Sequence, residues 1–138
     1  AIAASPDGKM VWMGSNTTGK VYVVDLAKRA VVDSVQTSGF PYRIAFTPDS
    51  RQAIITNPMS NEVWFINAAT RAKEAKIDVV APGGGNAGPF GLIVSPKGDR
   101  AWITMNGVGQ VAEVDLRTAT LARWMATGAG PDGIGLVP

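Results

Sequence analysis

The chain has 138 residues, of which 46% are hydrophobic and 17% are charged, with 13 basic and 11 acidic side chains. This length suits a single domain, and the apolar content argues against a disordered chain. Neither charge sign forms a run, so we expect no nucleic-acid partner, and no apolar segment approaches the about 20 residues of a membrane-spanning helix. The absence of histidine and cysteine excludes Ser-His triads, thiolate nucleophiles and histidine-ligated metal or haem within this chain.

The chain opens on a short apolar stretch that ends in a proline turn, and this unit recurs. Each turn begins with Ser or Thr followed by Pro, and a second proline follows later, at Pro41, Pro89 and Pro131. The recurrence predicts one domain, residues 1–138, with repeats at about 1–42, 43–90 and 91–132 and a fourth beginning at 133–138. The turns are Ser5-Pro6-Asp7-Gly8-Lys9, Thr47-Pro48-Asp49-Ser50-Arg51 and Ser95-Pro96-Lys97-Gly98-Asp99.

Each repeat contains four short apolar stretches, rich in Val, Ile and Trp and separated by Gly, Pro, Asn or Asp. Such stretches are typical of antiparallel strands rather than helices. The first and third stretches of each repeat are nearly continuously apolar, which predicts strands that are buried on both faces. The fourth stretch carries charged residues, which predicts an outer edge strand. The sequence therefore predicts an all-β fold: a β-propeller fragment of three four-stranded antiparallel blades plus the first strand of a fourth. A sandwich of twelve strands is the alternative.

The repeats resemble the YVTN-type β-propeller repeat over the whole chain. Residues 5–9 fit its Ser-Pro-Asp-Gly turn, Ile54-Ile55-Thr56-Asn57 fits its naming tetrad, and residues 21–26 and 111–116 fit its third strand. The equivalents of the tetrad at residues 12–15 and 102–105 depart from it. The resemblance implies an extracytoplasmic protein, periplasmic, secreted or on the cell surface, with about seven blades. Because three blades do not close a ring, we expect further blades from a longer chain or from a second copy.

The Pro-Asp-Gly turns present Asp7 and Asp49, which raises the question of a metal site. Proline sets the backbone of such a turn, and the Asp side chain bonds to the backbone that follows it. The third turn has Lys97 where a metal would need a carboxylate. We therefore expect turn chemistry and no metal site.

A glycine-rich segment, Gly83-Gly84-Gly85-Asn86-Ala87-Gly88, contains a formal G-x-G-x-x-G pattern. A dinucleotide site needs this pattern between a strand and a helix, and here Pro89 and another strand follow. The segment reads as an inserted loop between repeats, which is either a plain insertion or a binding loop that includes Asn86.

The connections that precede the first strands are the best candidates for a binding site. Strand alternation places them on one face, together with the inserted loop, close to the opening of the axial channel. Arg43 lies in a column otherwise occupied by glycine and could hold a carboxylate or phosphate, although an exposed or Asp132-paired arginine is the alternative. The candidate binding residues are Tyr42, Arg43, Asn86, Phe90 and Asp132.

The function expected from these features is a non-catalytic binding or scaffold segment that engages a protein or a small ligand through this loop face. No residue stands out as catalytic, and we expect no cofactor. The alternative is part of a propeller enzyme, such as a lactonase-like hydrolase or a quinoprotein or haem oxidoreductase domain, whose catalytic residues lie in other blades.

Overall fold

The computed structural model describes residues 1–137 and contains twelve strands and one 3₁₀ turn, η1 (Asn106–Val108). The strands are β1 (Ile2–Ala4), β2 (Met10–Gly14), β3 (Lys20–Asp25), β4 (Ala30–Gln36), β5 (Arg43–Phe46), β6 (Gln52–Asn57), β7 (Glu62–Asn67), β8 (Lys73–Asp78), β9 (Pro89–Val94), β10 (Arg100–Met105), β11 (Gln110–Asp115) and β12 (Thr120–Ala126).

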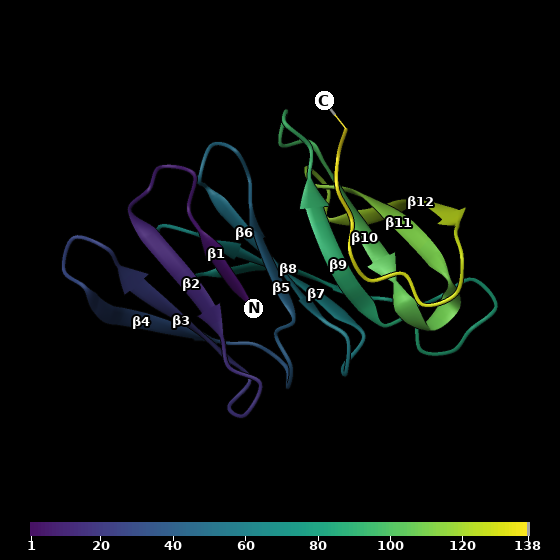
Figure 1. Ribbon diagram of the computed structural model, residues 1–138, viewed down its shortest axis with the longest axis horizontal. Helices are drawn as coiled ribbons and strands as arrows, with labels where there is room; N and C mark the ends of the chain where they lie inside the picture. Colours follow the sequence, from purple (N-terminus) through teal and green to yellow (C-terminus); the bar gives the residue numbers. More distant parts are fainter. Residues whose placement is uncertain (138) are drawn as a thin grey trace.

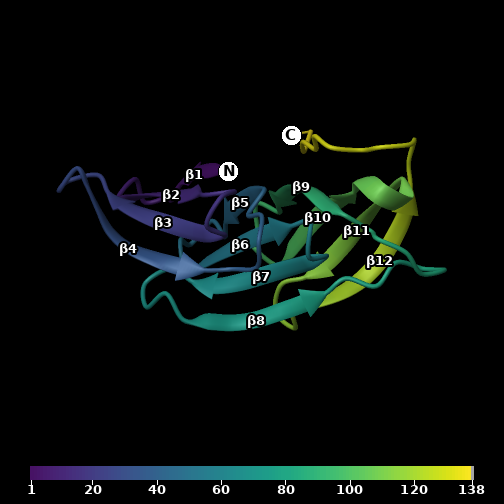
Figure 2. The same ribbon diagram turned by 90° about the horizontal axis from the view of Figure 1, so that it is seen from below.

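Consecutive strands form three separate four-stranded antiparallel sheets, β1–β4, β5–β8 and β9–β12, which we call blades 1, 2 and 3. The blades lie side by side as an arc (Figure 1). The first strands, β1, β5 and β9, follow its inner side, and the last strands, β4, β8 and β12, follow its outer side (Figure 2). The predicted blades are therefore confirmed, and a sandwich of two stacked layers is excluded.

Two apolar clusters hold the arc together, one at each junction between blades. The cluster between blades 1 and 2 joins Trp12 and Val23 to Phe46 and Ile55. The cluster between blades 2 and 3 includes Ile54 and Phe65, with residues of blade 3 packed against them. Trp12, Ile54 and Phe65 are fully buried. Since β6 contributes Ile55 to one cluster and Ile54 to the other, the alternating side chains of blade 2 fill both junctions.

Blades 1 and 3 each leave one face uncovered, and this changes the expected burial. Ile2 of β1 is 71% exposed, so the prediction that the first strands are buried on both faces is wrong for β1. The outer strands β4 and β8 are largely exposed, as their charges predict. Residues 133–137 form no strand. That a fourth blade begins there stays a prediction, and Pro138 lies outside the described residues.

Hydrogen bonds explain the acidic residues of the proline turns. The Ser5 hydroxyl donates to Asp7 Oδ1 at 2.6 Å, and the Thr47 hydroxyl donates to Asp49 Oδ1 at 2.6 Å. In the third turn, Ser95 donates to Asp99 at 2.9 Å. These bonds hold the pKa values of the three carboxyl groups below their usual range. Asp99 therefore supplies the carboxylate of the third turn, where Lys97 occupies the repeat position of Asp7 and Asp49.

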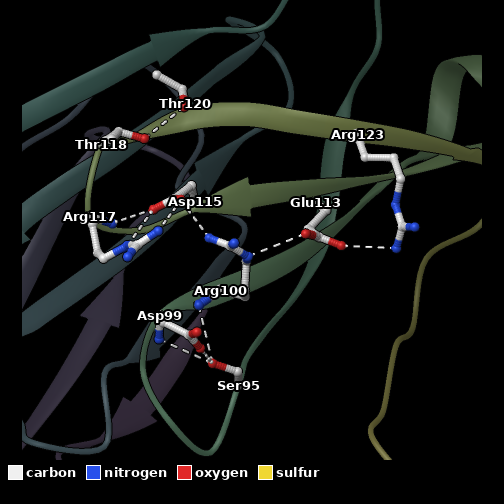
Figure 3. Close-up of polar contacts among 9 residues, drawn as sticks. All are labelled: Ser95, Asp99, Arg100, Glu113, Asp115, Arg117, Thr118, Thr120 and Arg123. Atoms are coloured by element: carbon white, nitrogen blue, oxygen red, sulfur yellow. Dashed lines mark hydrogen bonds and ion pairs between the residues drawn. The ribbon is translucent and has the colours of Figure 1, made fainter.

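The uncovered face of blade 3 carries a chain of ion pairs (Figure 3). Glu113 occupies the repeat position of the fully buried Val23 and Phe65. It pairs with Arg100 at 3.3 Å and with Arg123 at 3.1 Å. Arg100 also pairs with Asp115, which is bonded in turn to Arg117 at 3.0 Å. Blade 3 therefore presents charge where the other two blades present apolar side chains.

This ion-pair chain predicts how stability depends on pH. Hydrogen bonds from Arg117, with help from Arg100, hold the pKa of Asp115 well below its usual range. As the pH falls, the Asp115 carboxylate takes up a proton near pH 4 in the unfolded chain, but only at a lower pH in the folded chain. The free energy of unfolding is therefore expected to fall as the pH drops from about 5 toward 2. Asp115→Asn should unfold at a lower temperature at pH 7 and show a flatter dependence in this window. Thermal unfolding followed by circular dichroism between pH 7 and pH 2 measures both effects, and parallel curves for the two proteins would contradict the assignment.

Candidate functional site

Two threonines on second strands position the segments that lead into the next blade. The Thr56 hydroxyl accepts the Arg43 N–H at 3.2 Å and donates to the Phe90 carbonyl at 2.9 Å. The Thr104 hydroxyl accepts the Gly91 N–H at 2.6 Å and donates to the Asp132 carbonyl at 2.9 Å. The Thr56 hydroxyl therefore ties β5 of its own blade to the second residue of β9, and the Thr104 hydroxyl ties β9 to Asp132 in the segment after β12. Phe90 and Asp132 are fixed in equivalent places by this device.

Tyr42, Arg43 and Asp132 meet where these connections converge. The Tyr42 hydroxyl donates to Asp132 Oδ2 at 3.0 Å, and Arg43 Nη2 lies 3.9 Å from Asp132 Oδ1. The Arg43 guanidinium lies over the Tyr42 ring, 4.5 Å from its centroid. The side chains of Arg43 and Asp132 are 46% and 48% exposed, so both groups remain accessible to a ligand.

Aromatic rings flank this polar group on both sides. The Phe90 ring centroid lies 4.5 Å from that of Tyr42, and the Phe40 ring stacks on Tyr42 at 6.1 Å with an interplanar angle of 18°. Phe40 is not among the residues predicted from the sequence. A signal was present, however, because the residue before the second proline is glycine in the other two repeats, at Gly88 and Gly130.

Asn86 lies beside this cluster rather than within it. The end of the inserted loop is held in place, because the Gly88 N–H donates to Asn61 Oδ1 at 2.8 Å and the backbone of η1 bonds to Ala87 and Gly88. A shallow pocket of about 490 Å³ lies between this loop, Phe90 and the turn after β6. The structure thus joins four of the predicted residues directly and connects the fifth through the pocket, which is lined by Pro58, Met59, Asn86, Gly88, Phe90, Asn106 and Gly107.

The electrostatics of the cluster favour a neutral phenol between two opposite charges. Partial burial, followed by the hydrogen bond to Asp132, raises the pKa of Tyr42 above its ordinary value. The Tyr42 hydroxyl therefore remains a donor across the physiological range. This arrangement can receive a carboxylate or phosphate that competes with Asp132 for Arg43, while the rings supply apolar contact area. We call Phe40, Tyr42, Arg43, Phe90 and Asp132 the aromatic–arginine cluster.

Among residues 1–137, no group of three or more Asp or Glu side chains is arranged to hold a metal ion. Within the same range, no helix has the length and apolar character needed to cross a membrane.

Solved structures similar to this chain come from several functional classes. Hydrazine synthase of Kuenenia stuttgartiensis is 24% identical with a TM-score of 0.86, over 96% of this chain and 37% of that one. The dihydro-heme d1 dehydrogenase NirN is 18% identical with a TM-score of 0.79, over 92% of this chain and 28% of that one. The WD40 repeats of RRP9 are 9% identical with a TM-score of 0.78, over 91% of this chain and 37% of that one.

No protein-family profile and no curated protein sequence matches the chain. The chain spans between 28% and 37% of the length of the three solved structures. Likeness at these identities shows the fold and nothing finer. The three sheets are therefore blades of the β-propeller type, arranged as a propeller fragment.

Proposed function

We propose that this chain is a non-catalytic binding segment of an extracytoplasmic, YVTN-like β-propeller, and that it engages a partner through the aromatic–arginine cluster. The observation that carries the proposal is the convergence of residues from three separate parts of the chain, at the start of β5, at the start of β9 and after β12, on one accessible group. Packing of the core does not require these side chains, because Arg43 and Asp132 are both about half exposed.

The recognised group is proposed to be a carboxylate or a phosphate on a protein or a small ligand. Arg43 supplies the charge, and the Tyr42 hydroxyl supplies a second donor once Asp132 is displaced. Phe90 and the neighbouring pocket would then contact the apolar part of the partner.

Nuclear magnetic resonance titrations with acetate and inorganic phosphate test this assignment. We expect both probes, but not chloride, to shift the amide signals of residues 42–43 and 132. Arg43→Ala should weaken this response about tenfold or more, because a hydrogen bond to a charged group is lost. Arg51→Ala removes the same charge from an 87% exposed side chain in the turn between β5 and β6 and serves as the control. Equal responses from the two variants would contradict the proposal.

A second function remains open because two of the similar structures are named as enzymes. In that alternative the chain is part of a propeller enzyme, hydrolase or oxidoreductase, whose catalytic residues lie in other blades. An absorbance scan and metal analysis of the full-length protein distinguish the two functions, because a bound chromophore or stoichiometric metal would favour the enzyme.

A further inference from the structure

A second pocket lies at the opposite ends of the strands, between blades 1 and 2. It has a volume of about 190 Å³ and is bounded by the turns β1–β2, β5–β6 and β7–β8. Its apolar wall includes Phe46, Met10 and Ala68, beside the fully buried Trp12. Its polar lining includes the cations Arg71 and Lys9 and one carboxylate, Asp7, which is paired with Lys9. Apolar area combined with cationic groups is typical of sites for small organic anions.

Arg71 is the most unusual residue of this pocket. It lies in the β7–β8 turn with a left-handed backbone, φ 66°, and its guanidinium reaches across to the Trp12 ring of blade 1 at 5.4 Å. The side chain is only 15% exposed. Its Nε–H group is buried and has no hydrogen-bond partner within residues 1–137, and Asp33 Oδ2 lies 3.7 Å away, beyond hydrogen-bond length. The ion pair with Asp33 compensates this cation in part, and the low exposure of the side chain strengthens the attraction between its guanidinium and a further anion in the pocket.

The other repeats show that the fold does not require an arginine here. The equivalent left-handed turn positions hold Arg29, which is exposed, and Ala119, which packs against the cluster between blades 2 and 3. The corresponding pocket at that junction is wider, about 500 Å³. When the repeats are aligned, Ile54 and Val94 occupy the positions at that junction that correspond to Trp12 and Phe46. The buried cation and the two aromatic rings are therefore particular to the junction of blades 1 and 2.

A further hydrogen-bond donor borders the pocket. The Ser50 hydroxyl accepts the Asp7 N–H at 3.1 Å, which leaves its own proton available for an acceptor. Lys9 lies on the same rim, 3.7 Å from Asp7, and its side chain is 76% exposed. Two cations, one of them paired with Asp7, and the Ser50 hydroxyl therefore border one opening whose inner wall is apolar.

We propose that this pocket binds a small organic carboxylate with an aromatic or apolar body. The carboxylate accepts hydrogen bonds from the terminal nitrogens of Arg71, which present the planar fork that matches two oxygens, and from Ser50. The body packs against Phe46 and Met10. This site is separate from the aromatic–arginine cluster and does not depend on the function proposed for it.

Sodium benzoate is the probe for this site, and calorimetric titration of the 138-residue chain is the measurement. We expect saturable binding that is about tenfold weaker for acetate, which lacks the apolar body, and for benzyl alcohol, which lacks the charge. Arg71→Ala should weaken benzoate binding about tenfold or more. Arg29→Ala removes an arginine from the equivalent turn of blade 1 and should leave the affinity unchanged.

Arg71→Ala is expected to fold, since Ala119 occupies the same position in blade 3. If it does not fold, Arg71→Lys replaces it, because lysine keeps the charge but cannot pair with both oxygens in one plane. A lack of saturable benzoate binding to the unmodified chain overturns the proposal. So does an unchanged affinity in the Arg71 variant, or benzyl alcohol that binds as tightly as benzoate.

Discussion

Replacing Trp12 by alanine is expected to lower the free energy of unfolding by about 3–5 kcal/mol, the range for truncating a large buried aromatic residue. Trp12 is fully buried, lies edge-on to Phe46 with ring centroids 5.4 Å apart, and carries the Arg71 guanidinium on its face. The substitution would leave a cavity at the junction of blades 1 and 2 and remove the support beneath a buried cation. Thermal or urea unfolding followed by circular dichroism measures the loss.

Trp102→Ala is the matched control, because Trp102 stands in the same repeat position of blade 3. It is only partly buried, since no blade covers its face within the described residues. Its truncation is therefore expected to cost clearly less than that of Trp12. Equal losses in the two variants would show that the junction between blades 1 and 2 is not the source of the stability assigned to it.

Gly91→Ala is the second substitution with a large expected effect. A methyl group at residue 91 would lie 1.8 Å from the Asp132 carbonyl oxygen and 2.9 Å from the Thr104 hydroxyl. Backbone rather than a flexible side chain is the obstacle, so the connection at Asp132 must move or the inner strand must shift. We expect a loss of about 1–3 kcal/mol or more, as for overpacked sites. The hydrogen bond from Thr104 to Asp132 should be lost as well.

Gly133→Ala tests the same repeat position without the close contact, because nothing lies within 4 Å of a methyl group built at residue 133. This variant should unfold within about 0.5 kcal/mol of the unmodified chain, as surface substitutions usually do. Comparison of the two alanine variants by thermal unfolding isolates the clash from the general cost of replacing glycine. A Gly91→Ala chain as stable as the Gly133→Ala chain would rule out the close approach.

Much of the fold could be predicted from the repeat pattern of the sequence. Recurring Pro turns and apolar columns predicted three four-stranded blades, because each apolar stretch has the length and composition of a strand and each turn has residues suited to a sharp reversal. The same columns placed Tyr42, Phe90 and Asp132 in equivalent connections. In the structure, Tyr42 contacts both of the others. Position in the repeat thus predicted that these three residues converge, whereas it missed Phe40, which stacks on Tyr42.

The side-chain contacts between blades could not be predicted from the repeat pattern. Nothing in the local sequence of the β7–β8 turn indicates that Arg71 crosses to Trp12, because this contact depends on how one blade is seated on another. Glu113 looked like an ordinary strand residue, yet it replaces an apolar junction residue and is compensated by Arg100 and Arg123. Side-chain reach across a junction depends on the angle between sheets, which the linear sequence does not contain.

The bridging hydroxyls of Thr56 and Thr104 have a consequence for how the arc is built. The Thr56 hydroxyl connects β6 to Phe90 in the first strand of blade 3, and the Thr104 hydroxyl connects β10 to Asp132 in the segment after β12. Blade 1 has Gly14 at this repeat position, so blade 2 is seated on blade 1 without such a hydroxyl, through the apolar packing around Trp12 and Phe46. The two junctions of the arc are therefore aligned by different contacts, each of them between neighbouring repeats.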